Sequence, residues 1–127
     1  MNQHTILIVE DNHENYLLLN EILSMRNYHI LHAEHGALAI DFIKNYPQIS
    51  LVLMDLKMPK MNGYETTRKI KQLRPDLPII AQTANFMNNE TFEAMNAGCT
   101  SYITKPINFQ ELFAQIDEAL IESTELF

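Results

Sequence analysis

Cysteine is almost absent from this chain, because Cys99 is the only one among its 127 residues. An internal disulfide is therefore impossible, which is consistent with a reducing compartment. Long apolar runs are absent too, since none approaches the ~20 residues that a membrane span requires. The N-terminus lacks the basic start and the long apolar stretch of a signal peptide. We expect a cytoplasmic protein that does not cross a membrane.

Positive charge is also scarce. Nine Lys and Arg residues against 16 Asp and Glu residues give a formal net charge of −7. This balance disfavours direct nucleic-acid binding, which needs a basic face, and suits a protein that recruits a cation or a basic partner. Repeats, low-complexity tracts and linkers are missing from the sequence. The length and the 46% apolar content predict a single domain over residues 1–127.

Short apolar runs alternate with segments of helical periodicity along the whole chain. Strands are predicted at Thr5–Val9, His29–Ala33, Leu51–Met54, Pro78–Ala81 and Tyr102–Thr104. Helices are predicted at His13–Met25, Ala37–Asn45, Tyr64–Leu73 and Asn89–Ala97, with a last one capped by Asn108. This alternation favours a parallel sheet covered on both faces. Right-handed crossovers then give a doubly wound, three-layer α/β sandwich.

The apolar faces of several helices follow from the same periodicity. The first helix is expected to use Leu17, Leu18, Ile22 and Met25. The third is expected to turn Ile70 and Leu73 inward, and the last carries Leu112, Phe113, Ile116 and Leu120 on one face. Gly98 is the expected stop of the fourth helix.

Polar side chains follow four of the five predicted strands. Glu10 and Asp11 come after the first strand, Asp55 after the third, Thr83 shortly after the fourth and Lys105 after the fifth. Because ligand sites of doubly wound folds lie at the carboxyl ends of the strands, we expect these side chains to meet at one edge. The edge would then present three acids, a hydroxyl and an ammonium.

This set of groups indicates phosphoryl chemistry with a metal ion. Two carboxylates ~4 Å apart repel by about 4 kcal/mol at an effective dielectric near 20, so three of them need a cation. Oxygen ligands without His or Cys favour Mg²⁺. A hydroxyl and an ammonium beside the metal suit the oxygens of a phosphoryl group. Asp55 ends a buried apolar run and is the candidate nucleophile, since aspartyl phosphates are established covalent intermediates.

Four motifs carry a resemblance to a known family. They are ILIVEDN at 6–12, LVLMDLKMPKMNG at 51–63, PIIAQTA at 78–84 and AGCTSYITKPI at 97–107. In this order and at these distances they resemble the receiver domain of two-component response regulators. The motif VEDN and the segment LKMPKMNGYE are most similar to those of receivers associated with hybrid sensor histidine kinases.

The resemblance implies a flavodoxin-like (βα)5 fold with strand order 2-1-3-4-5. It also implies a phosphoacceptor switch of a phosphorelay, in which Asp55 takes a phosphoryl group from a histidine kinase or a histidine phosphotransfer protein. Asp11, Asp55 and the backbone carbonyl of Lys57 would hold Mg²⁺, and Glu10 would act through a water molecule. Such a domain assists its own phosphorylation and dephosphorylation but is not a turnover enzyme.

The resemblance further assigns Thr83 and Lys105 to the phosphoryl oxygens. Tyr102 falls where the family carries an aromatic side chain that swings inward when Thr83 moves. The face built from the fourth helix, the fifth strand and the fifth helix would then bind a downstream protein. Phe109, Phe113 and Tyr102 are its candidate contacts.

Some positions depart from the common family pattern. Glu10 replaces a more frequent Asp, and Gln82 stands where an apolar residue is usual. Taken singly, Asp11 could be a helix N-cap, Asp55 a turn residue and Lys105 a solvated lysine. His32 and His35 are close in sequence, but no acidic ligand set accompanies them, so we expect no metal site there.

Two other functions remain as alternatives. One is a degenerate receiver that binds proteins without being phosphorylated. The other is an aspartate-nucleophile phosphatase of the dehalogenase type, which needs a second acid two residues after the nucleophile, where this chain has Lys57. A flavin-binding flavodoxin is disfavoured because the first loop is acidic and, with no metal present, would repel a phosphate. Since no residues remain for an output domain after the last helix, we expect a stand-alone receiver or one cut from a larger kinase.

Overall fold

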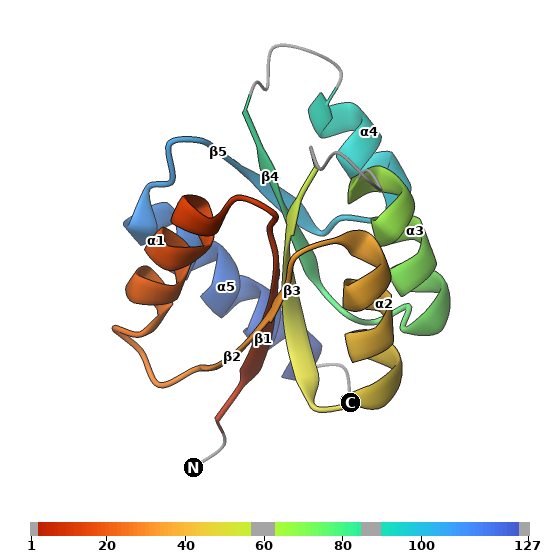
Figure 1. The fold of residues 1–127 in the computed structure, drawn as a ribbon, viewed down its shortest axis with the longest axis horizontal. Helices are drawn as coiled ribbons and strands as arrows, with labels where there is room; N and C mark the ends of the chain where they lie inside the picture. The colour runs from red at the N-terminus through yellow and green to blue at the C-terminus, as the bar shows by residue number, and fades with distance from the viewer. Residues whose placement is uncertain (1–2, 57–62, 85–89, 125–127) are drawn as a thin grey trace.

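Five strands and five helices alternate along the chain in the computed structural model, which describes residues 3–56, 63–84 and 90–124 (Figure 1). The strands are β1 (Thr5–Val9), β2 (His29–Ala33), β3 (Ile49–Asp55), β4 (Ile79–Thr83) and β5 (Ser101–Thr104). The helices are α1 (His13–Leu23), α2 (Gly36–Asn45), α3 (Gly63–Leu73), α4 (Glu90–Ala97) and α5 (Phe109–Thr124).

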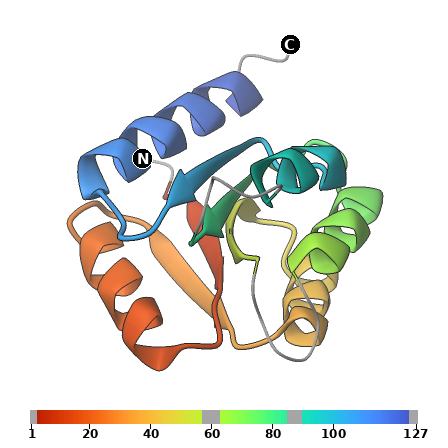
Figure 2. The same cartoon turned by 90° about the horizontal axis from the view of Figure 1, so that it is seen from above.

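The strands form one parallel sheet in the order β2-β1-β3-β4-β5. Helices α1 and α5 cover one face of the sheet, and α2, α3 and α4 cover the other (Figure 2). The predicted doubly wound three-layer sandwich and its strand order are therefore confirmed. The order reverses between β1 and β3, and the carboxyl ends of these two strands lie side by side at that point.

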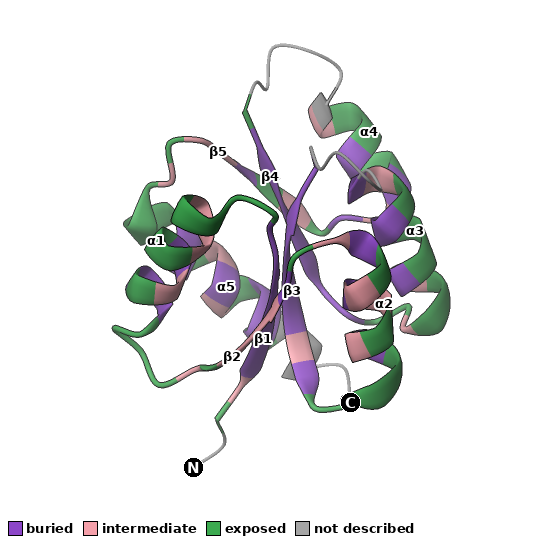
Figure 3. Ribbon diagram, viewed as in Figure 1, coloured by how far each residue is buried: buried purple, intermediate pink, exposed green. Residues whose placement is uncertain are grey.

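The core consists of two apolar clusters, one on each face of the sheet. Because side chains alternate along a strand, Leu7 and Val9 point towards α2 and α3 while Ile6 and Ile8 point towards α1 and α5. The inner strands β1, β3 and β4 are buried almost throughout, whereas the edge strand β2 is mostly half-buried (Figure 3). The weaker apolar pattern of β2 follows from its edge position. In the described part of the chain, no helix has the length and apolarity needed to cross a membrane.

Helix α1 differs from its prediction in length and in its buried face. It ends at Leu23 rather than at Met25, and its buried residues are Leu19, Ile22 and Leu23. Three side chains expected on the apolar face are instead exposed: Leu17, Leu18 and Met25. The run of three leucines allows more than one apolar stripe, and packing selects the one with i, i+3, i+4 spacing.

Smaller corrections concern the other elements. Leu73, expected inward, is 45% exposed at the end of α3, whereas Ile70 is fully buried. Asn108 caps α5 as predicted, accepting a hydrogen bond from the Glu111 N–H at 2.9 Å. Gly98 follows the last residue of α4 with φ of 119°, a conformation that favours glycine, so the predicted stop is confirmed.

Candidate functional site

Three carboxylates meet where the strand order reverses. The side chains of Glu10, Asp11 and Asp55 each offer an oxygen, and these oxygens all lie within 4.8 Å of one another. Glu10 and Asp55 are buried, at 0% and 4% exposure, while Asp11 is exposed. Asp55 closes β3, and Glu10 follows β1 directly, so the pairing of the two strands brings the acids together.

A positive charge lies next to the acids. The Nζ atom of Lys105 is 3.7 Å from Oδ1 of Asp55, and the Lys105 backbone N–H donates to the carbonyl of Thr83 at 2.9 Å. Thr83 is the last residue of β4 and is buried. Asp55 pairs with Gln82 in the sheet, so Thr83 lies one residue beyond the strand position opposite Asp55. The edge thus gathers the predicted groups from β1, β3, β4 and β5.

Local hydrogen bonds fix the loop that carries the first two acids. The Glu10 N–H donates to the Ala33 carbonyl at 3.0 Å, and Oε2 of Glu10 accepts from the Asn12 N–H at 3.2 Å. The N-cap of α1 is Asn12, whose side chain accepts from the Asn15 N–H at 2.9 Å. The alternative role of Asp11 as the cap is therefore wrong.

The electrostatics of Glu10 are those of a carboxyl held in the protein interior beside another acid. Burial raises the pKa of Glu10 to about 8, and the adjacent Asp55 carboxylate adds to the shift. Within the described residues, Oε1 of Glu10 is buried without a hydrogen-bond partner. A buried carboxylate oxygen without a partner is costly unless a donor or a cation pairs with it.

The donor set fits a divalent cation that prefers oxygen. All three side chains supply carboxylate oxygens, and the cluster combines close spacing with an unpaired buried oxygen. These are the properties that suit Mg²⁺. The backbone carbonyl of Lys57, the fourth predicted ligand, lies outside the described residues.

Sequence reasoning missed one residue that shapes this edge. Nε2 of His32 is 2.9 Å from the backbone carbonyl of Glu10, and its ring stacks on Tyr16 with centroids 3.7 Å apart and planes 3° apart. His32 and His35 hold no metal cluster among the described residues; His35 instead caps α2, where its Nδ1 lies 3.2 Å from the Leu38 N–H. No pattern in the sequence joins a histidine of β2 to a tyrosine of α1.

Gly63, at the start of α3, also shapes this edge. Its N–H donates to the Leu56 carbonyl at 3.0 Å. A Cβ atom at this position would lie 2.5 Å from the Asp55 carbonyl oxygen and 2.6 Å from Cα of Leu56. The beginning of α3 therefore packs directly against the backbone that carries the candidate nucleophile, and only glycine fits there.

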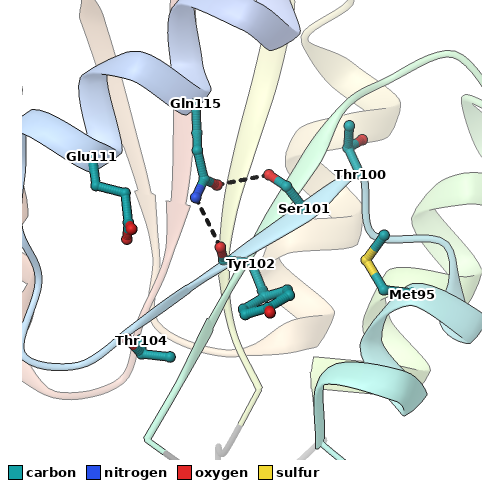
Figure 4. A pocket seen from close by; sticks show the side chains of 7 residues that line it. All are labelled: Met95, Thr100, Ser101, Tyr102, Thr104, Glu111 and Gln115. Atoms are coloured by element: carbon teal, nitrogen blue, oxygen red, sulfur yellow. Dashed lines mark hydrogen bonds between the residues drawn. The ribbon is translucent and has the colours of Figure 1, made fainter. Parts of the chain in front are cut away.

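Tyr102 lies on β5, the edge strand that pairs with β4. Its side chain projects into a pocket of about 380 Å³ between α4 and α5, with Met95 on one side and Glu111 on the other (Figure 4). Gln115 of α5 holds the strand, donating to the Tyr102 carbonyl at 2.9 Å and accepting from the Ser101 hydroxyl at 2.7 Å. In this structure Tyr102 is 39% exposed.

One of the three contacts expected on the face made by α4, β5 and α5 needs correction. Phe109 is 44% exposed, but Phe113 is only 8% exposed and belongs to the core between α5 and the sheet. The Arg26 guanidinium covers the Phe113 ring, with its carbon 4.2 Å from the ring centroid. Phe92 and Met95 of α4 are exposed at 71% and 46%, and sequence reasoning did not include them.

Comparison with known proteins gives a consistent result. The model of the family "Response regulator receiver domain" matches residues 6–117. The chain is 34% identical to the transcriptional regulatory protein CpxR of Escherichia coli over 93% of its own length and 50% of the relative's. It is 36% identical to the sensor histidine kinase GacS of Pseudomonas protegens, covering 84% of this chain and 12% of that protein. The matched curated relatives are thus at least about twice as long as the part that this chain spans.

Solved structures support the fold assignment. A CheY-like response regulator receiver domain protein from Methanospirillum hungatei superimposes with a TM-score of 0.90 at 31% identity, over 98% of both chains.

A hybrid signal transduction histidine kinase of Dictyostelium discoideum is 32% identical over 94% of this chain and 7% of that protein. Similarity therefore extends both to regulators and to hybrid kinases.

Proposed function

The chain belongs to the response regulator receiver domain family, and from that premise we propose that it is a phosphoacceptor switch with Asp55 as the acceptor. The observation that carries this proposal is the position of the Asp55 carboxylate. It lies at the end of β3, within 4.8 Å of the carboxylate oxygens of Glu10 and Asp11, and 3.7 Å from the Lys105 ammonium. Receiver domains pair with histidine kinases or phosphotransfer proteins, so the donor would be a phosphohistidine.

Each neighbour of Asp55 has a defined part in the proposed transfer. An Asp55 carboxylate oxygen attacks phosphorus, the phosphorus–nitrogen bond of the phosphohistidine breaks, and its electron pair stays on the imidazole. Lys105 offsets the charge on the phosphoryl oxygens, and the Thr83 hydroxyl donates to one of them. Asp11 and Asp55 would hold Mg²⁺ with the Lys57 carbonyl, and Glu10 would act through a water molecule. Bound there, Mg²⁺ would neutralise charge that the acids and the phosphoryl group bring together.

The proposed output is a change in the face made by α4, β5 and α5. Thr83 ends the strand that pairs with β5, and Tyr102 lies on β5 two residues before Thr104, the partner of Thr83 in the register. A hydroxyl drawn towards a phosphoryl group on Asp55 would open space behind it for the Tyr102 ring. Inward movement of that ring would alter the pocket between α4 and α5, and with it the affinity for a downstream protein. Phosphorylation shifts this equilibrium only by its differential interaction with the two states.

The test is phosphorylation by small molecules, read as intact mass. The protein is incubated with acetyl phosphate, and separately with phosphoramidate, which carries a phosphorus–nitrogen bond as phosphohistidine does. We expect one added phosphoryl group that depends on Mg²⁺, is absent from Asp55→Asn and is removed by hydroxylamine, as an acyl phosphate is. Lack of the added mass with both donors, in folded protein, would overturn the proposal and favour the phosphorylation-independent binding module.

A further inference from the structure

Strand β5 leaves one edge of the sheet open. It is the last strand in the order β2-β1-β3-β4-β5, so backbone groups that face away from β4 have no strand to pair with. The Lys105 N–H faces β4, since it donates to the Thr83 carbonyl at 2.9 Å. Because the backbone groups of successive residues alternate between the two sides of a strand, those of Thr104 and Tyr102 face the open side. The Tyr102 carbonyl agrees with this direction, because it accepts from the side chain of Gln115 on α5.

A pocket runs along this open edge. It is the pocket of about 380 Å³ between α4 and α5, and its volume lies within the range of about 300–1,000 Å³ that is usual for binding sites (Figure 4). In the described part of the chain, the Tyr102 N–H and the backbone groups of Thr104 have no hydrogen-bond partner. Water or another chain must satisfy them. The pocket therefore offers a short row of backbone donors and acceptors.

The two sides of the open edge differ in chemistry. Ile103 packs in the apolar cluster beneath α5, so the neighbouring side chains of Tyr102 and Thr104 project to the α4 side of the sheet. Met95 of α4 lines the pocket on that side and is exposed. On the α5 side the lining is polar and includes the exposed carboxylate of Glu111. A strand whose side chains alternate between apolar and polar would match both sides at once.

The charge of the pocket favours a basic occupant. Glu111 is the only Asp, Glu, Lys, Arg or His residue in the described lining, and the whole chain has a net charge of −7. A Lys or Arg beside Glu111 would form an ion pair, and the net charge would attract it from a distance. A second copy of this chain would bring the same negative charge, which disfavours self-pairing. The charge therefore points to a different polypeptide.

We propose that β5 accepts an extended segment of a partner protein as an added strand, in which basic residues alternate with apolar ones. The backbone of the segment would pair with Thr104 and with the Tyr102 N–H. Its apolar side chains would enter the space beside Met95, and a Lys or Arg would reach Glu111. Gln115 already occupies the Tyr102 carbonyl, so it would limit the pairing to this short stretch.

This inference rests on the proposed function for its regulation. In that proposal the Tyr102 ring moves inward when Asp55 is phosphorylated, which would enlarge the space beside Met95 for the apolar side chains of the segment. The segment should then bind the phosphorylated protein more tightly, by the difference in its affinity for the two states. The pairing with β5 itself requires no phosphate, so the two proposals can fail separately.

The first experiment titrates the peptide acetyl-Val-Lys-Val-Lys-Val-amide into the ¹⁵N-labelled protein without a phosphodonor. We expect saturable shifts of the Tyr102 and Thr104 amide signals, and smaller shifts at Ile103, which faces β4. Two analogues then test strand pairing, one N-methylated at its two lysines and the other at its last two valines. Only one analogue should lose affinity, by at least about fivefold, because every second amide of an added strand faces β5.

Variants test the charge, and a phosphodonor tests the regulation. Glu111→Gln should weaken peptide binding about 2- to 5-fold. Glu34→Gln removes the same charge at an exposed position after β2, the opposite edge strand, and should not weaken it. With acetyl phosphate and Mg²⁺, binding should tighten in the natural protein but not in Asp55→Asn.

Two outcomes would overturn strand pairing. One is the lack of a saturable shift at Tyr102 and Thr104 with the parent peptide. The other is equal affinity of the two N-methylated analogues, which would indicate a helical or irregular occupant. Strand pairing whose affinity does not change when intact mass shows full phosphorylation would overturn the regulation and leave the pairing in place.

Discussion

At the scale of single residues, the side chain of His32 connects the acidic loop to α1. Its Nε2 atom lies 2.9 Å from the Glu10 carbonyl, and its ring stacks on Tyr16. Since the carbonyl of Glu10 belongs to the peptide that leads into Asp11, its direction helps to set where the Asp11 carboxylate points. The hydrogen bond therefore holds a proposed metal ligand through the backbone.

Two substitutions of His32 distinguish the hydrogen bond from the stacking. His32→Phe keeps a ring against Tyr16 but loses the donor, and we expect Mg²⁺ to bind about 2- to 10-fold more weakly, the worth of one hydrogen bond. His32→Gln keeps a donor at a similar reach and should bind Mg²⁺ close to the natural protein. Isothermal titration measures both affinities, with urea unfolding as a check on stability. Natural affinity in His32→Phe would show that the hydrogen bond does not position Asp11.

The residues of the site differ in how far sequence could predict them. Asp55 is the last residue of β3 and Lys105 directly follows β5. The topology of a parallel sheet brings such positions to one edge whatever their separation in the chain. Strand position also explains the gathering of Glu10 and Asp11. The stacking of His32 on Tyr16 could not be predicted from the sequence, because it depends on the rotamers of two residues from different elements. The identity of the N-cap of α1 also depends on local side-chain geometry. Asn12 takes this role, which Asp11 could have filled.

At the scale of elements, the contact between α3 and β3 depends on one missing side chain. Gly63 begins α3, and its Cα faces the backbone of Asp55 and Leu56 so closely that a Cβ would overlap with backbone atoms. Backbone atoms cannot rotate away as a flexible side chain can. Any larger residue must shift either the helix or the end of the strand that carries the candidate nucleophile.

Gly63→Ala is therefore expected to lower the free energy of unfolding by about 1–3 kcal/mol, as overpacking does, and to slow phosphorylation of Asp55 by acetyl phosphate. Urea unfolding and the rate of mass gain measure the two effects. Lys69→Ala, at an exposed position of the same helix, is the control and should change stability by less than about 0.5 kcal/mol. A Gly63→Ala protein as stable as this control would mean that the start of α3 is not held against β3.

The ends of the elements were harder to predict than their order. The sequence prediction ended the third strand at Met54 and the fourth at Ala81, where the runs of apolar residues end. In the structure both strands run further, because Asp55 still pairs with Gln82, and Thr83 with Thr104. A polar residue can complete a backbone ladder as well as an apolar one. The apolar pattern measures burial against the core, so it stops short where function places polar groups in a strand.

At the scale of the whole molecule, the net charge of −7 and the acidic cluster oppose folding in the absence of metal. Glu10 makes this opposition depend on pH. Its pKa is raised from the ordinary value of 4.5 to about 8 by burial and by Asp55. Between these two values the folded protein holds a proton that the unfolded chain has released. Stability from this group is complete below pH 4.5 and is lost as the pH rises through 8.

The metal-free protein is therefore expected to become less stable from pH 5.5 to pH 8, by at most about 1.4 kcal/mol per pH unit from this one group. Mg²⁺ binds the ionised carboxylates, so its stabilising effect should grow over the same range and offset the decline. Urea unfolding with and without 10 mM Mg²⁺, at matched ionic strength, measures both trends. Glu10→Gln cannot ionise at this position and should remove most of the pH dependence. The opposite result would be a metal-free protein that gains stability towards pH 8, with the same pH dependence in Glu10→Gln. It would mean that Glu10 is ionised in the folded state at neutral pH and that the acids do not oppose folding.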